Sequence, residues 1–202
     1  MYMKNGSNRR VALKLVLASL IMLVCVGFFK TDVKAATNTN DRTIYINLAA
    51  QKVAVFKNGE ALPEKVFLCS TGKFDNTPVG SFKSENFYYD WHELYGSVYS
   101  YGAIRIKGSF LIHSVPELRP IFGTTDSVAY NKLGTKDSLG CVRLTQRDLN
   151  YLLTTTSVGV PIVIINDPNT DWVLTESYTK VDESSAMCYD PSIDWSALGL
   201  NI

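Results

Sequence analysis

Residues 43–57 read TIYINLAAQKVAVFK, and this stretch decides the fold class. Two runs rich in β-branched and aromatic residues flank Ala49–Gln51, which is the pattern of a β-hairpin. The pair Asn58-Gly59 supplies the next turn, and KVFLCS at 65–70 is expected to return as a third strand. The folded part of the chain is therefore expected to begin as an antiparallel sheet.

Further strands and one clear helix follow along the chain. AIRIKG and SFLIHS (103–114) predict a strand pair around Lys107-Gly108, and residues 124–134 can hold a short helix. The clear helix opens at Thr145, where Asp148 stands three residues on as in a capping box, and GVPIVIIN (159–166) predicts a buried strand. Many short strands with one or two short helices predict a mainly β domain.

Residues 86–102, NFYYDWHELYGSVYSYG, are crowded with aromatic side chains. This segment is expected to form either a strand pair or a flap that presents a stacking surface. After residue 176 the chain is acidic but still carries Tyr178, Tyr189, Trp195 and Leu198, which a disordered tail would not need. The tail is therefore expected to pack partly on the domain.

The N-terminal 35 residues have the pattern of an export signal. Four basic residues precede an uncharged run from Leu15 to Phe29, and Val33 and Ala35 provide a small-residue cleavage pattern. The uncharged run is short for a membrane span, so we expect a cleaved signal peptide at 1–35, with an uncleaved anchor through 11–29 as the alternative. A polar leader at 36–42 is expected to follow the signal.

Removal of residues 1–35 leaves a mildly acidic domain. The remainder carries 14 basic and 18 acidic residues, a formal charge of −4. No basic surface for nucleic acid is expected from such a balance, and that class of partner is set aside. About 167 residues are enough for one domain with a proper core.

Three cysteines remain after the signal, an odd number for an exported protein. A Cys69–Cys188 disulfide with Cys141 free is one reading, and the favoured reading is that Cys69 is a small buried hydrophobic residue. Cys141 stands in DSLGCVRL (137–144), where Gly140 removes side-chain bulk beside the sulfur. This glycine turn is expected to leave backbone N–H groups for an oxyanion.

A thiol nucleophile needs a neighbouring base or positive charge. His113 in FLIHSVP (110–116) is the better candidate for the base, with Ser114 or a backbone carbonyl to fix its tautomer, while His92 is interpreted as an aromatic-surface residue. Arg143 lies two residues after Cys141, on the same face if the stretch is extended, and can bind a carboxylate. No metal-ligand cluster or cofactor motif is found.

Five ordered segments resemble the L,D-transpeptidase (YkuD-type) catalytic domain family. SLGCVRL, from Ser138 to Leu144, is similar to its S/T-x-G-C-x-R signature, and FLIHSVP resembles its upstream histidine segment. The hairpin at 44–60, CSTGKFDNTPVGSF at 69–82, and the closing helix and strand match in the same order. The resemblance implies a catalytic domain at 43–166 followed by a C-terminal extension at 167–202.

The resemblance also implies the fold and the reaction: a β-sandwich with a flap over the active site, and no cofactor. Cys141 would attack a peptidoglycan tetrapeptide stem and release D-alanine, with His113 as base and Gly140, Arg143, Ser114 and Ser138 in oxyanion or substrate binding. An amine of a second stem would then complete a 3→3 cross-link, or water would give L,D-carboxypeptidase activity. A secreted, wall-associated enzyme of the Gram-positive type is implied.

One position departs from the family pattern. Members often carry a second histidine before Gly-Cys, where this chain has Leu139, and this leaves the acceptor open. A sortase would place threonine directly before the cysteine, and a papain-like protease would place the cysteine before the histidine. A wall-binding protein without catalysis is the alternative from another class.

Overall fold

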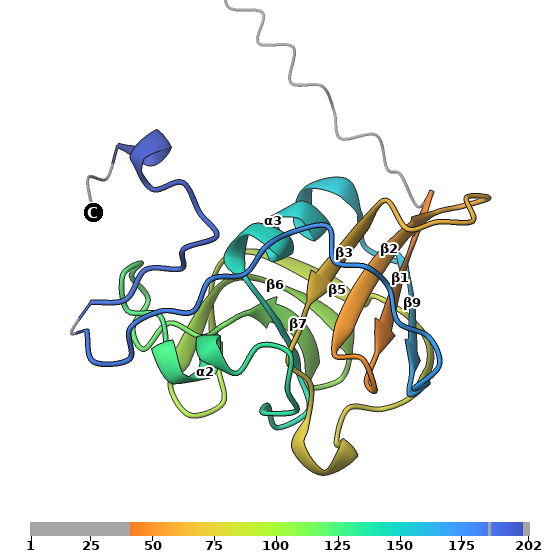
Figure 1. Ribbon diagram of the computed structural model, residues 1–202, viewed down its shortest axis with the longest axis horizontal. Coiled ribbons are helices and arrows are strands. Elements are labelled where there is room, and N and C mark those ends of the chain that lie inside the picture. Colours follow the sequence, from red (N-terminus) through yellow and green to blue (C-terminus); the bar gives the residue numbers. More distant parts are fainter. Residues whose placement is uncertain (1–40, 186, 200–202) are drawn as a thin grey trace, which may run out of the picture. The chain divides into compact units, whose positions relative to one another are not determined.

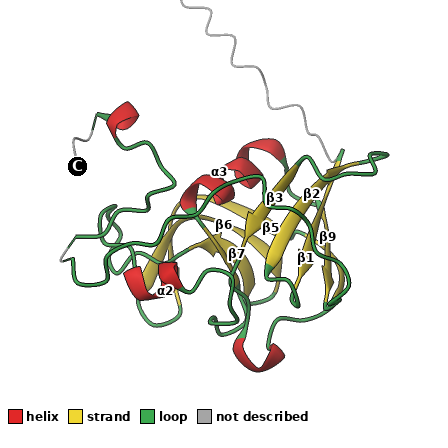
Figure 2. Cartoon of the chain, viewed as in Figure 1, coloured by secondary structure: helices red, strands yellow, loops and turns green. Residues whose placement is uncertain are grey.

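The computed structural model describes residues 41–185 and 187–199, and most of the regular secondary structure in this part is β-strand (Figure 1). Five strands form sheet A in the order β3-β2-β1-β9-β4, and four form sheet B in the order β5-β6-β7-β8. The α-helices α2 and α3 lie beside these strands, and Figure 2 shows a long, mostly loop segment after β9. The predicted mainly β fold is confirmed. The elements are β1 (Arg42–Asn47), β2 (Lys52–Lys57), β3 (Lys65–Leu68), a 3-10 turn (Lys73–Asp75), β4 (Gly80–Lys83), β5 (Asn86–Leu94), β6 (Val98–Lys107), β7 (Phe110–Ser114), α2 (Ser127–Asn131), β8 (Val142–Leu144), α3 (Gln146–Thr155), β9 (Pro161–Ile165) and a second 3-10 turn (Ser196–Leu198).

The opening hairpin forms as its pattern predicts. β1 and β2 pair antiparallel with Ile44 opposite Val55, and β2 continues into the antiparallel pair with β3. β1 begins at Arg42, one residue before the predicted domain start, where Arg42 pairs with Lys57 of β2 and its guanidinium binds the carboxylate of Glu64. β9 then runs parallel to β1, and its Ile162 lies opposite Ile44.

The core lies between the two sheets because alternate side chains of each strand point to it. Ile44 and Ile46 of β1 and Ile112 of β7 are completely buried or nearly so, and they belong to one hydrophobic cluster. Leu149 and Leu152 of α3 join the same cluster. Residues that alternate with these positions therefore lie on the outer face of each sheet. The candidate site lies on the outer face of sheet B.

The helix α3 begins as expected, with Thr145 as its N-cap. The Thr145 hydroxyl accepts a hydrogen bond from the backbone N–H of Asp148 at 3.2 Å. The Asp148 carboxylate bonds to the side chains of Arg147 and Tyr178, so the observed contacts form one half of a capping box. The predicted short helix forms as α2, which Asp126 caps.

The C-terminal extension packs along the domain. The Tyr178 hydroxyl accepts from the backbone N–H of Leu68 and donates to Asp148, so it joins β3 to α3. Further on, the Asp190 carboxylate accepts from the backbone N–H of Gln146 at 2.7 Å, at the first residue of α3. Trp195 is 5% exposed. The expectation that the tail packs on the domain is confirmed.

The three cysteines of the described residues are free, and Cys69 and Cys188 are both buried. The favoured reading of Cys69 as a buried hydrophobic residue is confirmed, and a Cys69–Cys188 disulfide is not formed. Within residues 41–185 and 187–199, no helix has the length and apolar character needed to cross a membrane. The predicted signal peptide at 1–35 lies outside the described residues.

Candidate active site

The parallel pairing of β7 with β8 brings the predicted histidine and cysteine segments together. His113 lies opposite Arg143 in this register, and Cys141 directly precedes β8. Ile112 and Val142 point into the core. The side chains of His113, Cys141 and Arg143 therefore share the outer face of sheet B.

These three side chains line one pocket of about 270 Å³. Its other walls include Leu139 from the cysteine turn and Glu93, Leu94, Tyr95 and Val98, which lie where β5 turns into β6. The aromatic segment is thus a strand pair whose turn also borders the pocket. The expected strand pair is confirmed, and its turn borders the pocket where the flap is expected.

A closed set of hydrogen bonds holds the turn before Cys141. The Ser138 hydroxyl donates to the carbonyl of Cys141 at 2.6 Å and accepts from the backbone N–H of Gly140 at 3.0 Å. The hydroxyl of Thr77 donates to the Gly140 carbonyl at 2.8 Å and accepts from the backbone N–H of Gly72. Ser138 therefore fixes the turn, and the N–H of Gly140 is already occupied.

Gly140 occupies a position that no other residue fits. Its φ is +144°, and a Cβ built there would lie 2.7 Å from the Phe110 ring. A Cβ on Gly72 would lie 2.9 Å from the Cα of Gly140, so the two backbones are in direct contact. This close approach explains why the 69–82 segment and the cysteine turn each have a glycine at the point of contact.

His113 is buried, and its tautomer is fixed by the chain itself. Its Nδ1 lies 2.6 Å from the carbonyl oxygen of Ser114, and because a carbonyl only accepts, Nδ1 carries the proton. The lone pair is then on Nε2. Burial lowers the pKa of His113 to about 4, and the positive charge of Arg143 acts in the same direction.

The orienting group is thus the Ser114 carbonyl, one of the two expected possibilities. The Ser114 hydroxyl lies 2.8 Å from the hydroxyl of Ser100, and both side chains are buried. The backbone N–H of Ser114 also donates to Ser100. Ser100, which the sequence analysis did not single out, therefore fixes the strand end that carries His113.

The Cys141 thiol donates to the carbonyl of Ser109, with a sulfur–oxygen distance of 3.7 Å. Burial raises the pKa of this thiol, and the positive charge of Arg143 opposes the rise without cancelling it. With the pKa of His113 near 4, both partners are neutral at pH 7. The resting pair is a thiol and an imidazole.

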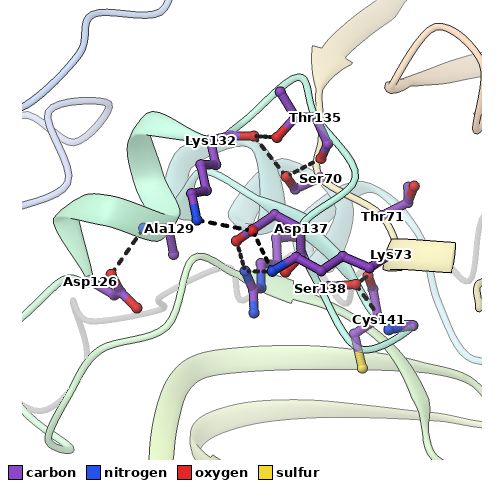
Figure 3. Close-up of polar contacts among 12 residues, drawn as sticks. Ser70, Thr71, Lys73, Asp126, Ala129, Lys132, Thr135, Asp137, Ser138 and Cys141 are labelled. Carbon is purple, nitrogen blue, oxygen red and sulfur yellow. Dashed lines mark hydrogen bonds and ion pairs between the residues drawn. The ribbon is translucent and has the colours of Figure 1, made fainter.

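Asp137 organises the cations beside the cysteine turn (Figure 3). Its carboxylate binds Lys73 at 2.9 Å, Lys132 at 3.2 Å and Arg143 at 3.1 Å. Burial would raise the pKa of Asp137, but the hydrogen bonds from Lys73 and Lys132 outweigh it and lower the pKa. Arg143 is thereby fixed in place, and no signal in the sequence pointed to Asp137 as its partner.

His92 is placed apart from this pocket. Its ring stacks on Tyr88 with centroids 4.2 Å apart, and the Tyr88 hydroxyl accepts from Arg105 at 2.9 Å. This agrees with the reading of His92 as an aromatic-surface residue. Arg105 itself lines the pocket.

The comparisons with known proteins agree with this arrangement. Residues 41–164 match the family model of the L,D-transpeptidase catalytic domain. An L,D-transpeptidase from Mycobacterium smegmatis is 19% identical, with a TM-score of 0.50 over 61% of this chain and 58% of that one. The L,D-transpeptidase LdtMt1 in complex with imipenem is 21% identical, with a TM-score of 0.50 over 62% and 59% of the two chains.

These two structures are similar in fold, and the match spans less than two thirds of their length. No curated protein matches the chain by sequence. The family match covers well over half of the chain and contains the pocket, the cysteine turn and both sheets.

Proposed function

Because the chain belongs to the L,D-transpeptidase catalytic domain family, we propose that it is a cysteine acyltransferase that forms 3→3 peptidoglycan cross-links. Cys141 attacks the carbonyl of the third residue, a diamino acid, in a tetrapeptide stem. The amide bond to the terminal D-alanine breaks, and a thioester forms on the sulfur. The amine of a second stem then attacks the thioester and regenerates the thiol.

The observation that carries this proposal is the β7–β8 register, which sets His113 and Cys141 on one face of one pocket. A thiol beside an imidazole of fixed tautomer is the arrangement for acyl transfer. The proposal does not depend on His92, which is stacked on Tyr88.

The proton path follows from the protonation states. The neutral thiol gives its proton to Nε2 of His113 as the sulfur attacks, and the imidazolium then protonates the departing amine of D-alanine. The Ser114 carbonyl, which accepts from Nδ1–H, stabilises the imidazolium while it exists. In the second half-reaction His113 removes a proton from the attacking amine and returns it to the sulfur.

The developing oxyanion requires N–H donors near the sulfur. The Gly140 N–H is bonded to Ser138, whereas none of the hydrogen bonds described for the turn uses the N–H of Leu139 or Cys141. We assign the oxyanion to these two groups. Gly140 and Ser138 then act by holding the backbone in the conformation that presents them.

Arg143 contributes a fixed positive charge to the donor side of the pocket. Its guanidinium is held by Asp137, so it attracts a stem carboxylate without reaching out into solvent. Leu139 is 68% exposed at the pocket wall and replaces a polar side chain there with an apolar surface.

The substrate places the enzyme outside the cytoplasm, at the cell wall. The signal pattern at 1–35 provides the route of export, and the proposed partners are the donor and acceptor stems of peptidoglycan. The chemistry assigned to Cys141 and His113 requires no metal or cofactor.

The test is mass spectrometry of purified disaccharide-tetrapeptide after incubation with the chain under reducing conditions. Loss of one alanine together with a 3→3 dimer is the expected result. Alanine loss without a dimer would assign L,D-carboxypeptidase activity instead. An unchanged substrate with a folded, reduced protein would refute the catalytic proposal and favour a wall-binding role.

The matched control is Cys141→Ala. This change replaces the thiol with a hydrogen and adds no bulk, so the fold is expected to be retained. Turnover is expected to be abolished because the nucleophile is missing. Turnover by the folded variant would refute the assignment of the nucleophile.

A further inference from the structure

A second concave site lies on the outer face of sheet A. It has a volume of about 460 Å³, larger than the cysteine pocket. Tyr45 of β1 and Phe56 of β2 contribute to it from the sheet, and Trp172 contributes from the C-terminal extension. We call this site the aromatic groove.

The three rings of the aromatic groove meet edge to face. The centroid distances are 5.2 Å between Tyr45 and Phe56, 6.5 Å between Tyr45 and Trp172, and 6.2 Å between Phe56 and Trp172. All three side chains are only partly buried. Part of this aromatic surface therefore stays open to solvent.

The segment that carries Trp172 is tied to the sheet. Lys52 donates to the backbone carbonyl of Trp172 at 2.7 Å and binds Asp171 at 2.6 Å. The side-chain amide of Asn47 donates to the carbonyls of Asp167 and Thr170. The groove is thus preformed, and its tryptophan lies beyond residue 164, where the family match ends.

The groove and the cysteine pocket lie on opposite faces of the sandwich. Tyr45 alternates with the core residues Ile44 and Ile46 of sheet A, and His113 alternates with Ile112 of sheet B. Because both sets of core residues meet in one cluster, the two outer faces point in opposite directions. A ligand in the groove leaves the cysteine pocket open.

The rim of the groove selects a polar but uncharged ligand. The hydroxyls of Thr43 and Thr170 donate to Asn58 and Asp167, so their oxygens reach the rim as hydrogen-bond acceptors, while Lys57 and Glu60 cancel in charge. Nucleic acid and acidic lipid would need a net positive surface, which Lys57 and Glu60 together do not provide. A sugar ring fits both parts, because its C–H face packs on aromatic rings and its hydroxyls bond at the rim.

We propose that the aromatic groove binds the glycan strand of peptidoglycan through its N-acetylated sugars. The choice of glycan rests on the function proposed above, which already brings this polymer to the protein. A strand held on sheet A raises the local concentration of stems from neighbouring strands at the cysteine pocket. The groove therefore acts as a tether for polymeric substrate and has no role with isolated stem peptides.

The test uses a tetramer of N-acetylglucosamine, which has no stem peptide. The chain has three tryptophans, Trp91, Trp172 and Trp195, so its indole N–H signals can be followed individually by two-dimensional NMR of the full chain. The signal of Trp172 is expected to shift saturably on titration. Trp195 serves as the internal control, because its indole N–H is buried and donates to the Asp190 carbonyl.

A pair of variants tests the same site. Trp172→Ala is expected to weaken tetramer binding by roughly tenfold, the usual effect of truncating an aromatic anchor. Tyr95→Ala removes an exposed aromatic side chain at the cysteine pocket and is expected to leave tetramer binding unchanged. Trp172→Ala is further expected to slow cross-linking of polymeric peptidoglycan while release of alanine from soluble tetrapeptide keeps its rate.

The outcomes separate this proposal from the proposed function. Alanine release without any shift of the Trp172 signal at about 10 mM tetramer overturns the groove and leaves the catalytic assignment standing. A saturable Trp172 shift without alanine release supports the groove and overturns the catalytic assignment. Loss of tetramer binding in Tyr95→Ala, with Trp172→Ala unaffected, places the sugar in the cysteine pocket and also overturns the groove.

Discussion

Acidification is expected to destabilise this protein through His113. The unfolded chain takes up a proton as the pH falls through 6.5, whereas the folded protein resists protonation of His113 until about pH 4. The stabilisation is therefore complete above pH 6.5 and is lost as the pH falls toward 4. A pKa lowered from 6.5 to about 4 corresponds to about 3 kcal/mol of unfolding free energy.

The measurement is urea denaturation between pH 7 and 4.5 on the wild type and two variants. The chain has only two histidines, so His113→Asn and His92→Asn form a matched pair. Between these pH values the wild type is expected to lose about 2 to 3 kcal/mol more than His113→Asn. His92→Asn is expected to follow the wild type closely, because His92 is less buried and its pKa is lowered less by burial.

Parallel pH dependences for the wild type and His113→Asn would refute this reasoning. Carboxyl groups that titrate in the same pH range do not affect the difference in stability between the wild type and the variants. Burial raises the pKa of Glu117 and of Asp190, but both residues are present in all three proteins. Their contribution cancels when the slopes are subtracted.

Three further changes test the cysteine turn and the extension. Gly140→Ala should lower the free energy of unfolding in urea by about 2 to 5 kcal/mol, because the new Cβ adds strain at positive φ and lies 2.7 Å from the Phe110 ring. The control Gly59→Ala has a φ of +90° but nothing within 4 Å, so it should cost only about 1 to 2 kcal/mol. Equal losses in the two variants would contradict the packing argument. Asp137→Asn should lower the free energy of unfolding by about 1 to 3 kcal/mol and reduce kcat/KM, because Lys73, Lys132 and Arg143 lose their shared carboxylate. An unchanged kcat/KM would show that the cysteine turn keeps its conformation without the Asp137 carboxylate. Asp190→Ala should shift the urea midpoint by an amount worth about 1 to 2 kcal/mol, because the backbone N–H of Gln146 loses its acceptor while the Thr145 cap stays. An unmoved midpoint would show that the extension adds nothing there.

The strands of this fold could be predicted because each one carries its own pattern. The alternation in β1 and β2 and the turn at Asn58-Gly59 are local signals, and the Thr145 cap is one as well. The pairing of β9 between β1 and β4 has no such signal, since the buried run at 161–165 does not specify its neighbours. An alternating pattern predicts which face of a strand is buried, but it does not predict which strands pair with each other; the pairing depends on how the core packs.

Some residues of the candidate site could likewise be predicted from local sequence, and others could not. Cys141, His113 and Gly140 could be predicted as site residues because they stand in short segments that resemble the family's motifs in the same order. Asp137 and Ser100 could not be assigned, because an isolated aspartate or serine has no distinguishing context until β7, β8 and the turn are assembled. Their roles depend on partners brought close by tertiary structure, such as the contact of Ser100 with Ser114.

The extension shows why a family boundary is not a folding boundary. The family match ends at residue 164, yet Tyr178 joins β3 to α3 and Asp190 caps the helix that directly follows the cysteine strand. A cap supplied from 44 residues away leaves no trace in the local sequence of α3. Residues 167–185 and 187–199 are therefore tied to β3 and to the helix that follows the Cys141 strand.

The neutral state of the catalytic pair bears on how a free thiol survives in the exported setting proposed above. Oxidation of cysteine follows thiolate character and exposure. Burial raises the pKa of Cys141 and lowers that of His113, so the resting site holds little thiolate at neutral pH. In the proposed mechanism the thiolate arises mainly during attack, when His113 accepts the proton and the carbonyl carbon takes the sulfur lone pair. We therefore expect the neutral pair to protect the proposed nucleophile between turnovers, while the unprotonated His113 stays available as the proton acceptor that the proposed reaction requires.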